Sequence, residues 1–321
     1  MRKMGKIKIV AIVGPTASGK TGLAVELAKR FNGEVVSADS MQIYSELSIG
    51  TARPSEEEKQ GICHHLIGFL DVNEDYSVAD YVNDAREAVR DIVSRGKLPI
   101  LCGGTGLYVD SFLQNTQFEE IESDPIVHEK LLHLAENEGK EKFFERLKAV
   151  DPKSAERLHF NNLGRVLRAL EVYELTGKTM TELQEQSHRE PSPYDVCYIG
   201  TTFEDREKLY TRIERRIDSM LDKGILDEAR FLLEHDNTST ATQAIGYKEF
   251  FPYFQGKSTL EDVVNMLKKE TRHYAKRQLT WFRRNEKIHW LFRDHYETQE
   301  MLYDEAATIV EHWRYYEEQN A

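Results

Sequence analysis

The most constraining feature of this sequence is an eight-residue segment near its N-terminus. Residues 14–21 read Gly-Pro-Thr-Ala-Ser-Gly-Lys-Thr and match the phosphate-binding pattern G-x-x-x-x-G-K-[ST]. A β-branched run over residues 7–13 precedes the segment, and apolar residues recur at helical spacing after it. A second strand is expected by residue 37. This strand–loop–helix context excludes a chance glycine-rich turn.

The chemistry of such a loop follows from its residue types. Glycines let the backbone curl so that several N–H groups and the N-terminus of the next helix face an anion. Lys20 adds a point charge, and Thr21 offers a hydroxyl to Mg²⁺. We therefore predict that a diphosphate is held by Gly14, Pro15, Thr16, Ala17, Ser18, Gly19, Lys20 and Thr21, with Thr21 as the Mg²⁺ ligand.

The pattern after the loop predicts an α/β fold. A helix capped by Ser77 should run to about Gly96, followed by a buried strand over 98–101. Alternating strands and helices imply a parallel sheet with helices on both faces. From about 124 to about 186 the pattern is helical only, and strand character resumes at 196–199. We expect a P-loop core (1–120 and 191–321) interrupted by an all-helical insertion domain (121–190).

The end of the chain is expected to be mostly helical. A long amphipathic helix should begin at a capping box formed by Ser258 and Glu261 and end near Asn285. A short strand is expected over 288–292.

Composition narrows the class of protein. The chain has 321 residues, of which 40% are hydrophobic and 31% charged, so it can bury a core. No apolar stretch is long enough to span a bilayer, and no signal-peptide pattern follows the basic residues 1–3. We expect a cytoplasmic protein without a membrane partner, and a monomer. The net charge of −12 means that any nucleic-acid contact must come from a locally basic face.

The cysteines give no sign of a disulfide or zinc scaffold. Cys63, Cys102 and Cys197 are odd in number and far apart, so we expect them to be reduced and buried. The run Cys63-His64-His65 invites a metal interpretation, but no further ligands stand at usual spacing. Turn or core residues are the favoured interpretation, and no zinc site is expected.

Asp39 is the conspicuous carboxylate near the predicted loop. It follows the second strand, and loops after the carboxyl ends of parallel strands line the ligand crevice of such folds. Asp39 is therefore a candidate base or magnesium partner, with a simple turn-capping role as the alternative. The strand at 98–101 runs into Cys102-Gly103-Gly104 without a carboxylate. The acidic strand end of an ATPase or kinase is therefore not evident.

A basic helix is expected near the C-terminus. Residues 268–287 carry eight Lys or Arg against two Glu, a balance of +6, with Tyr274, Trp281 and Phe282 interleaved. Cations beside stacking faces are typical of single-stranded nucleic-acid sites. The alternative is a solvated helix whose aromatic residues face the core. Arg215 and Arg216 form a second cationic candidate, and one of them could clamp the diphosphate.

Several motifs in order resemble one family. They are residues 14–21, 37–44 (Ser-Ala-Asp-Ser-Met-Gln-Ile-Tyr), 49–54 (Ile-Gly-Thr-Ala-Arg-Pro), 103–108 (Gly-Gly-Thr-Gly-Leu-Tyr) and 276–283 (Lys-Arg-Gln-Leu-Thr-Trp-Phe-Arg). Together with 168–173 and 244–249, they resemble the bacterial tRNA dimethylallyltransferases of the IPP transferase family. The resemblance implies transfer of a dimethylallyl group from dimethylallyl diphosphate to N6 of the adenosine 3′ of a tRNA anticodon, with Mg²⁺.

The resemblance also assigns roles to residues. Lys20, Thr21 with Mg²⁺, and Arg216 would neutralise charge on the leaving diphosphate, and Asp39 would accept the N6 proton. The tRNA anticodon stem-loop would lie against Asp39, Ser40, Met41, Gln42, Thr105, Leu163, Gly164, Arg165, Val166, Leu167, Gln243, Ala244, Ile245, Gly246, Tyr247, Lys248, Lys276, Arg277, Gln278, Leu279, Thr280, Trp281, Phe282 and Arg283.

The sequence departs from the family pattern in the insertion. Residues 159–166 lack the acidic residue followed by basic ones that the pattern has there. Three rival functions stay open: a prenyltransferase acting on free adenine nucleotide, a kinase, and an RNA-binding module with a structural phosphate loop. The basic helix and an insertion of about 60 residues favour a macromolecular acceptor.

Overall fold

The computed structural model describes residues 5–119, 121, 124–187, 190–234, 241 and 244–318. Contacts divide the chain into two compact units. The first comprises residues 1–113 and 193–321, and the second comprises residues 114–192. The second unit thus interrupts the first in sequence, at boundaries a few residues from those expected.

The first unit is built on a parallel sheet. Among the described residues it has six strands in the order β3-β2-β4-β1-β5-β6. They are β1 (Ile7–Val13), β2 (Gly33–Ser37), β3 (His64–His65), β4 (Leu98–Gly103), β5 (Tyr194–Thr202) and β6 (His289–Phe292). Val13 at the end of β1 pairs with Gly103 on one side and Gly200 on the other. The strand ends therefore meet at one edge, where ligands of such sheets bind.

The predicted strand–helix–strand unit over residues 6–37 is present, but its two strands do not pair. α1 (Lys20–Arg30) connects β1 to β2, and β4 lies between them. Sequence periodicity identifies each strand and helix. It does not show that a strand from later in the chain, here β4, pairs between β1 and β2.

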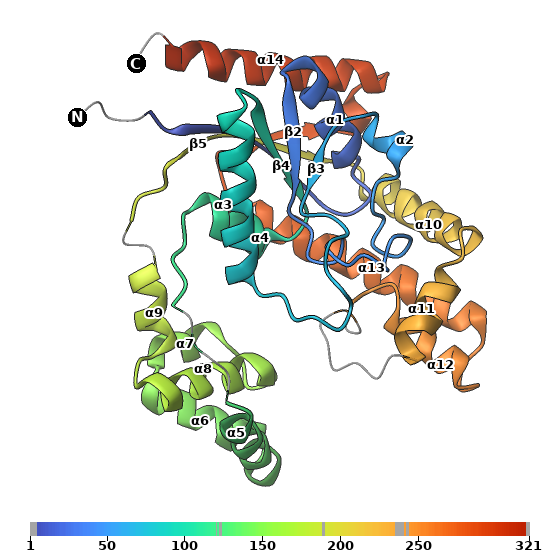
Figure 1. Cartoon of the computed structure of the whole chain (residues 1–321). Helices are drawn as coiled ribbons and strands as arrows, with labels where there is room; N and C mark the ends of the chain where they lie inside the picture. The colour runs from blue at the N-terminus through green and yellow to red at the C-terminus, as the bar shows by residue number, and fades with distance from the viewer. Residues whose placement is uncertain are drawn as a thin grey trace. The chain divides into compact units, whose positions relative to one another are not determined.

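Helices cover both faces of the sheet, as expected (Figure 1). Ile9, Ala11 and Val13 pack with α3 (Val78–Ser94) and α4 (Gly106–Leu113). Val10 and Ile12 face α1 and α14 (Gln299–Glu318). Because both faces are buried, the central strand is a continuous apolar run rather than an alternating one. Ser77 caps α3 as predicted, in a capping box with Asp80.

A separate cluster of helices packs around the loop that follows β2. It contains α10 (Arg206–Asp222), α11 (Ile225–Glu234), η2 (Lys248–Phe250), α12 (Phe251–Phe254) and α13 (Leu260–Phe282). Tyr44, Ile213, Tyr247 and Phe250 are fully buried in its core. The short α2 (Glu56–Lys59) and η3 (Arg293–His295) complete the first unit.

The capping box of α13 lies one residue later than predicted. Thr259, not Ser258, accepts the amide of Asp262, and the Asp262 carboxylate accepts the amide of Thr259. Both registers fit the same sequence pattern, because a hydroxyl residue and an acid three positions later occur twice in succession. The strand expected over 288–292 is confirmed as β6.

The second unit is helical, as predicted. It contains α5 (Pro125–Glu138), α6 (Lys140–Val150), α7 (Pro152–Arg157), α8 (Leu163–Thr176) and α9 (Met180–Ser187). Asp124 and Asp151 cap α5 and α7, and each precedes a proline in the first turn. Leu131, Phe143 and Leu147 lie in its core.

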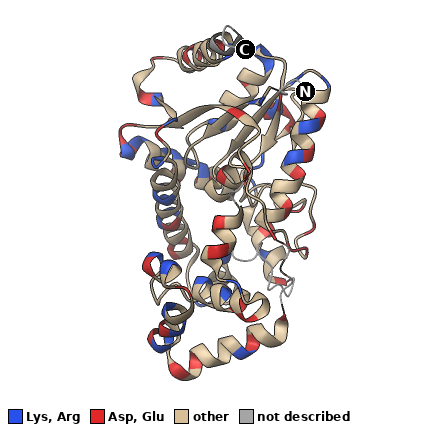
Figure 2. Ribbon diagram, turned by 90° about the vertical axis from the view of Figure 1, so that its left-hand side faces the viewer, with Lys and Arg blue, Asp and Glu red and all other residues tan. Residues whose placement is uncertain are grey.

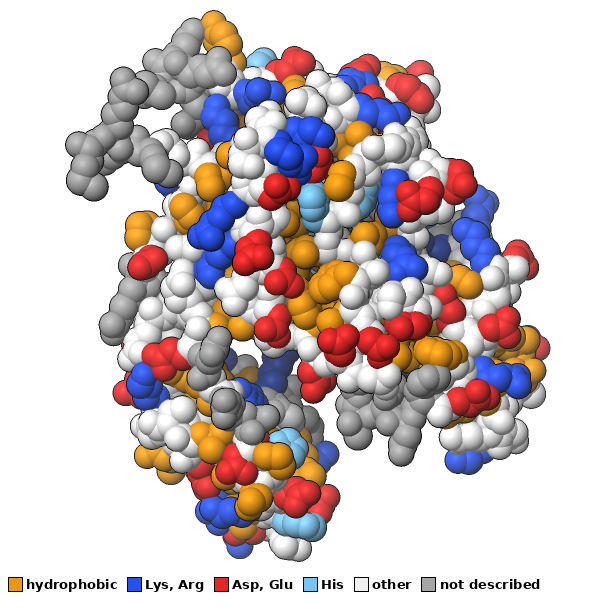
Figure 3. All heavy atoms as spheres, in the orientation of Figure 1, with side chains coloured by type: hydrophobic (Ala, Val, Ile, Leu, Met, Phe, Trp, Pro, Cys, Tyr) orange, Lys and Arg blue, Asp and Glu red, His pale blue; other side chains and the backbone are white. Residues whose placement is uncertain are grey.

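Charge is mixed over the molecule. Basic and acidic residues are interspersed along the helices (Figure 2). On the face shown in Figure 3, apolar patches lie between side chains of both signs. No helix among the described residues combines the length and the apolar character needed to cross a membrane.

Candidate active site

Residues 14–19 form the tight turn between β1 and α1. Gly14 has φ +147°, and a Cβ atom there would lie 2.3 Å from the carbonyl oxygen of Thr201, so only glycine fits. Ser18 is buried, and its carbonyl accepts the Thr201 hydroxyl at 2.8 Å. The neighbouring strand β5 thus fixes the turn, and α1 begins at Lys20 beside a cavity.

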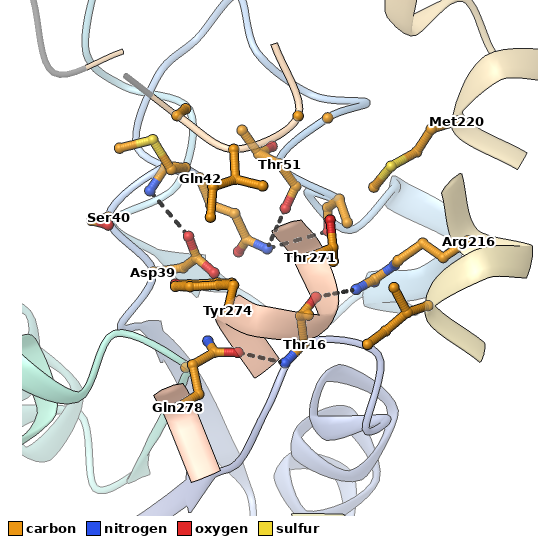
Figure 4. A pocket seen from close by; sticks show the side chains of 18 of the residues that line it. Thr16, Asp39, Ser40, Gln42, Thr51, Arg216, Met220, Thr271, Tyr274 and Gln278 are labelled. Atoms are coloured by element: carbon orange, nitrogen blue, oxygen red, sulfur yellow. Dashed lines mark hydrogen bonds between the residues drawn. The ribbon is translucent and has the colours of Figure 1, made fainter. Parts of the chain in front are cut away.

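A cavity of about 320 Å³ opens beside the phosphate loop (Figure 4). This volume is in the range of small-molecule sites, roughly 300–1,000 Å³. The cavity is formed by the loop, the segments after β2 and β4, α10, α13 and residues 244–246. Its lining includes Thr16, Lys20, Thr21, Asp39, Ser40, Met41, Gln42, Cys102, Arg216, Ala244, Ile245, Gly246 and Gln278. The fold therefore brings together candidate residues from opposite ends of the sequence.

Asp39 lies two residues beyond β2 and lines this cavity. One carboxylate oxygen accepts the amide of Met41 at 3.0 Å, so Asp39 does cap the following turn. Burial raises the pKa of Asp39 above its usual value, while the Met41 amide and the charge of Lys20 act in the opposite direction. A carboxylate with a raised pKa is a stronger base, so the capping and catalytic interpretations are compatible.

Two cations line the same cavity. The Lys20 ammonium donates to the carbonyl oxygen of Pro15 at 2.7 Å, and burial lowers the pKa of Lys20 to about 8. The Arg216 guanidinium donates to the Thr16 hydroxyl at 3.2 Å, and burial lowers the pKa of Arg216. Arg215 is exposed and does not line the cavity, so Arg216 is the better candidate for a clamp. Two cations and one carboxylate suit an anionic ligand.

Cys102 lies near the end of β4, where an ATPase or kinase with a phosphate loop would carry an acidic residue. It is the penultimate residue of β4 and lines the cavity. Burial raises the pKa of the Cys102 thiol to about 11, so the thiol is neutral at physiological pH. The end of β4 therefore offers the cavity no carboxylate.

The helix α13 has one side toward the cavity and another toward solvent. Tyr274 lines the cavity, whereas Lys276, Arg277 and Arg283 are exposed. The Arg277 guanidinium lies 5.7 Å from the centre of the Tyr274 ring. The exposed cations and the cavity are thus joined by a single helix.

Only one face of the Trp281 indole is open for stacking with a base. Its indole N–H donates to Asp110 at 2.7 Å, and the Arg284 guanidinium lies 4.1 Å from the centre of the indole. One face of the ring is therefore already used by a cation.

Five of the side chains predicted to lie against RNA are buried in the structure. Val166 and Leu167 lie in the core of the helical unit, and Tyr247 and Phe282 lie in cores of the first unit. Gln278 is 6% exposed and binds protein groups. The apolar stripes of α8 and α13 face inward, so a contiguous sequence segment contributes only part of its side chains to a surface.

The other predicted RNA contacts differ in position. Thr105 lies outside the cavity lining, and its hydroxyl oxygen accepts the amide of Ser40 at 3.0 Å. Gly164, Arg165, Lys248 and Thr280 are exposed, and Leu163 and Leu279 are half-buried. Gln243 lies outside the described residues.

The Cys63-His64-His65 run forms neither a turn nor a core, and Cys63 is exposed, contrary to expectation. The run leads into the edge strand β3, and pairing with β2 brings Glu34 beside it. Ligand atoms of Glu34, Cys63 and His65 lie within 4.8 Å of one another. Both Glu34 oxygens are already bound by Arg95, and one also by Lys97 at 2.7 Å. Cations on the carboxylate disfavour a metal ion there.

Sequence reasoning missed the contacts by which two polar residues organise the cavity. Gln278 was expected at the RNA surface but connects the phosphate loop to the end of β4. Glu228 on α11 was not singled out, although its carboxylate holds residues 48–50. Neither has a sequence signal of its own, since Gly104 lies 174 residues from Gln278 and Gly50 lies 178 residues from Glu228.

The sequence matches known proteins over most of its length. The family model described as IPP transferase matches residues 42–285. The tRNA dimethylallyltransferase of Acetivibrio thermocellus is 47% identical over 296 residues, which cover 92% of this chain and 94% of that protein. The tRNA dimethylallyltransferase of Caldanaerobacter subterraneus subsp. tengcongensis is 48% identical over 299 residues, covering 92% and 95%.

Solved structures agree with these matches. The tRNA isopentenylpyrophosphate transferase of Bacillus halodurans aligns with a TM-score of 0.72 and 41% identity, covering 98% of this chain and all of that one. A eukaryotic dimethylallyltransferase acting on tRNA aligns with a TM-score of 0.76 and 33% identity, covering 89% and 74%. The α/β fold predicted from the sequence is therefore confirmed by the structure and by these similar proteins.

Proposed function

The chain belongs to the IPP transferase family, and we propose that it transfers a dimethylallyl group from dimethylallyl diphosphate to N6 of the adenosine 3′ of a tRNA anticodon. The observation that carries this proposal is the composition of one cavity. Lys20, Thr21 and Arg216 line it together with Asp39, so a diphosphate-binding loop and a general base share one space.

The reaction balances with the residues present. The lone pair of N6 forms a bond to C1 of the dimethylallyl group while the bond from C1 to the diphosphate oxygen breaks. The electron pair of that bond leaves with diphosphate, and the N6 proton passes to Asp39. Lys20 and Arg216 stabilise the charge that grows on the departing diphosphate. The raised pKa of Asp39 suits this role, because a base works best with a pKa near the working pH.

Magnesium fits the oxygen donors of this cavity. The Thr21 hydroxyl and the Asp39 carboxylate both line it, and Mg²⁺ typically takes one or two such protein ligands beside substrate phosphates. Thr21 would hold the ion in this proposal. When bound, Mg²⁺ supplies further positive charge at the diphosphate.

The proposed acceptor is the anticodon stem-loop of tRNA. A base that reacts at N6 must leave its stack, and aromatic side chains usually replace the lost stacking. Tyr274 lines the cavity from α13, Lys276 and Arg277 are exposed on the same helix, and Arg283 is exposed directly after it. These exposed cations offer contacts to the phosphates of the tRNA.

The experiment that tests this proposal supplies the purified protein with dimethylallyl diphosphate, Mg²⁺ and unmodified tRNA. We expect prenylated adenosine on nucleoside analysis and negligible transfer of γ-phosphate from ATP. Faster prenylation of free AMP than of tRNA would support the nucleotide prenyltransferase instead. Binding of tRNA without any turnover of the donor would leave only an RNA-binding function.

A further inference from the structure

Glu228 holds one wall of the cavity without lining it. One oxygen of its carboxylate accepts the amide of Ser48 at 2.9 Å, the Ser48 hydroxyl at 3.0 Å and the amide of Ile49 at 2.9 Å. The other accepts the amides of Ile49 at 3.0 Å and Gly50 at 3.1 Å, and the Tyr247 hydroxyl at 2.9 Å. A single side chain on α11 thus binds two segments that are far apart in sequence.

Both segments continue directly into the cavity. Gly50 is followed by Thr51 and Ala52 in the lining, and Tyr247 is preceded there by Gly246. The segments also touch, because a Cβ atom on Gly50 would lie 2.5 Å from the Tyr247 ring. Glu228 therefore sets the position of a wall made from both of them.

The same wall is linked to the region of the base. The side-chain amide of Gln42, three residues beyond Asp39, donates to the carbonyl oxygens of Thr51 and Ala52 at 3.3 and 3.2 Å. Figure 4 shows Asp39, Gln42 and Thr51 at the same cavity. A shift of residues 48–52 would therefore also displace Gln42 and the loop that carries Asp39.

Only a carboxylate satisfies the site that Glu228 occupies. All its partners are donors, namely the amides of Ser48, Ile49 and Gly50 and two hydroxyls. A glutamine would direct its NH₂ group at other N–H groups, leaving at least one backbone amide without a partner. The negative charge of Glu228 is stabilised by these N–H and O–H donors. This accounts for an acidic residue close to a cavity whose lining otherwise suits anions.

We propose that Glu228 is a positioning residue for the prenyl donor, acting through residues 48–52 and 244–247. This inference rests on the proposed function, because it assumes that the cavity takes dimethylallyl diphosphate. Glu228 touches neither substrate; it keeps the wall in the shape that the donor requires. Its loss weakens donor binding and leaves tRNA binding to the exposed face of α13 intact.

The test compares Glu228→Gln with wild type in steady-state kinetics and in titrations with dimethylallyl thiolodiphosphate, a slowly reacting donor analogue. We expect the KM for dimethylallyl diphosphate and the analogue Kd to rise about tenfold or more, the effect of losing one charge-assisted hydrogen bond. kcat and the KM for tRNA should change less than about threefold. Tyr247→Phe, which removes one hydroxyl hydrogen bond to the Glu228 carboxylate, should raise the same donor constants by about tenfold.

Glu234→Gln is the matched control, since Glu234 is an exposed acid on the same helix. It should leave all constants unchanged. An unchanged donor KM in a folded Glu228→Gln protein would overturn the inference. So would an equal fall in activity toward both substrates, because that reports only loss of folded protein. If Glu228→Gln does not fold, Tyr247→Phe tests the inference in the same way: the donor constants should rise while kcat and the KM for tRNA stay nearly unchanged. Failure of the proposed function differs from all of these, because wild type itself would then neither bind the analogue nor transfer the prenyl group.

Discussion

The side-chain carbonyl of Gln278 accepts the backbone amide of Thr16 at 2.8 Å. The amide group of Gln278 donates to the carbonyl oxygen of Gly104 at 3.0 Å. One buried side chain of α13 thus joins the phosphate loop to the end of β4. The helix that carries the exposed cations is therefore rigidly connected to the loop proposed to bind diphosphate.

Changing Gln278 to Glu should weaken donor binding. The carboxylate would no longer donate to Gly104, and it would place a negative charge beside the loop that we propose receives the diphosphate. We expect the Kd of a diphosphate donor to rise at least about tenfold, because like charges a few ångströms apart repel strongly in a partly buried site. Calorimetric titration measures this. Gln255→Glu, at an exposed position, is the control, and equal donor binding by both variants would contradict the prediction.

Replacing Asp39 by Asn should separate catalysis from binding. The amide keeps the size of the side chain but accepts no proton, so we expect turnover to fall at least about a hundredfold with near-normal tRNA affinity. In wild type the base is active when ionised, so kcat/KM should rise with pH through the raised pKa of Asp39 in the free protein and then level off. Single-turnover rates across a pH series test both points. An equal loss of tRNA binding would make Asp39 a structural residue.

The same variant should be more stable than wild type at neutral pH. Burial raises the pKa of Asp39, so the folded state binds this proton more tightly than the unfolded state does. Stability from this group is present at pH below the unfolded pKa and is lost as pH rises through the folded pKa. Asp39→Asn removes the buried charge and should melt at a higher temperature at pH 7. A lower melting temperature across the whole pH range would contradict this.

Lys20 should make anion binding depend on pH in the alkaline range. Burial lowers its pKa to about 8, so the free protein loses this charge as pH rises through that value. A bound diphosphate favours the charged form, so the donor Kd should rise with pH above about 8, by up to about tenfold per unit. Titration of wild type and Lys20→Met with the donor analogue between pH 7 and 9.5 tests this. The variant should bind weakly and lack the additional pH dependence.

Local sequence patterns predicted the parts of the site whose position follows from sheet topology. The loop at 14–21 and the cap at Ser77 are defined by residues close in sequence. Asp39 was placed correctly because loops after parallel strands share one edge. The contacts of Gln278 and Glu228 were not predictable, because each depends on the packing of segments that are distant in sequence.

The sequence also did not predict which residues near the end of α13 face the core. Trp281 and Phe282 are neighbours, yet Phe282 is buried and Trp281 is half-buried. Successive helical residues point about 100° apart, so a small difference in helix rotation exchanges their roles. The pairing of β3 with β2 likewise placed Glu34 beside His65, which no spacing rule indicates.

Glu34 should contribute to stability in a pH-dependent way. The Arg95 guanidinium, with Lys97 and His65, lowers the pKa of this buried carboxyl well below its usual value. Its stability contribution is therefore present above the unfolded pKa and is lost as pH falls toward the folded one. Glu34→Gln should reduce the free energy of unfolding by about 1 kcal/mol at pH 7, because it weakens the hydrogen bonds from Arg95 and Lys97, whose own charges stay largely exposed to solvent. Urea unfolding at pH 7 and pH 4 should show a smaller difference between variant and wild type at the lower pH.

The double variant Lys276→Ala with Arg277→Ala should bind tRNA more weakly and with less dependence on salt. Both side chains are exposed on α13. Each phosphate contact adds about 0.7 to 0.9 to the slope of log K against log salt, so losing two should flatten that slope by roughly 1.4 to 1.8. Lys268→Ala with Arg272→Ala removes the same charge from the same helix, but these cations pair with Asp218 and Glu214 on α10. We expect this control variant to change the salt slope much less. The affinity for the prenyl donor should stay constant in the Lys276→Ala, Arg277→Ala variant. Equal slopes for both double variants would mean that α13 binds RNA only through its overall charge.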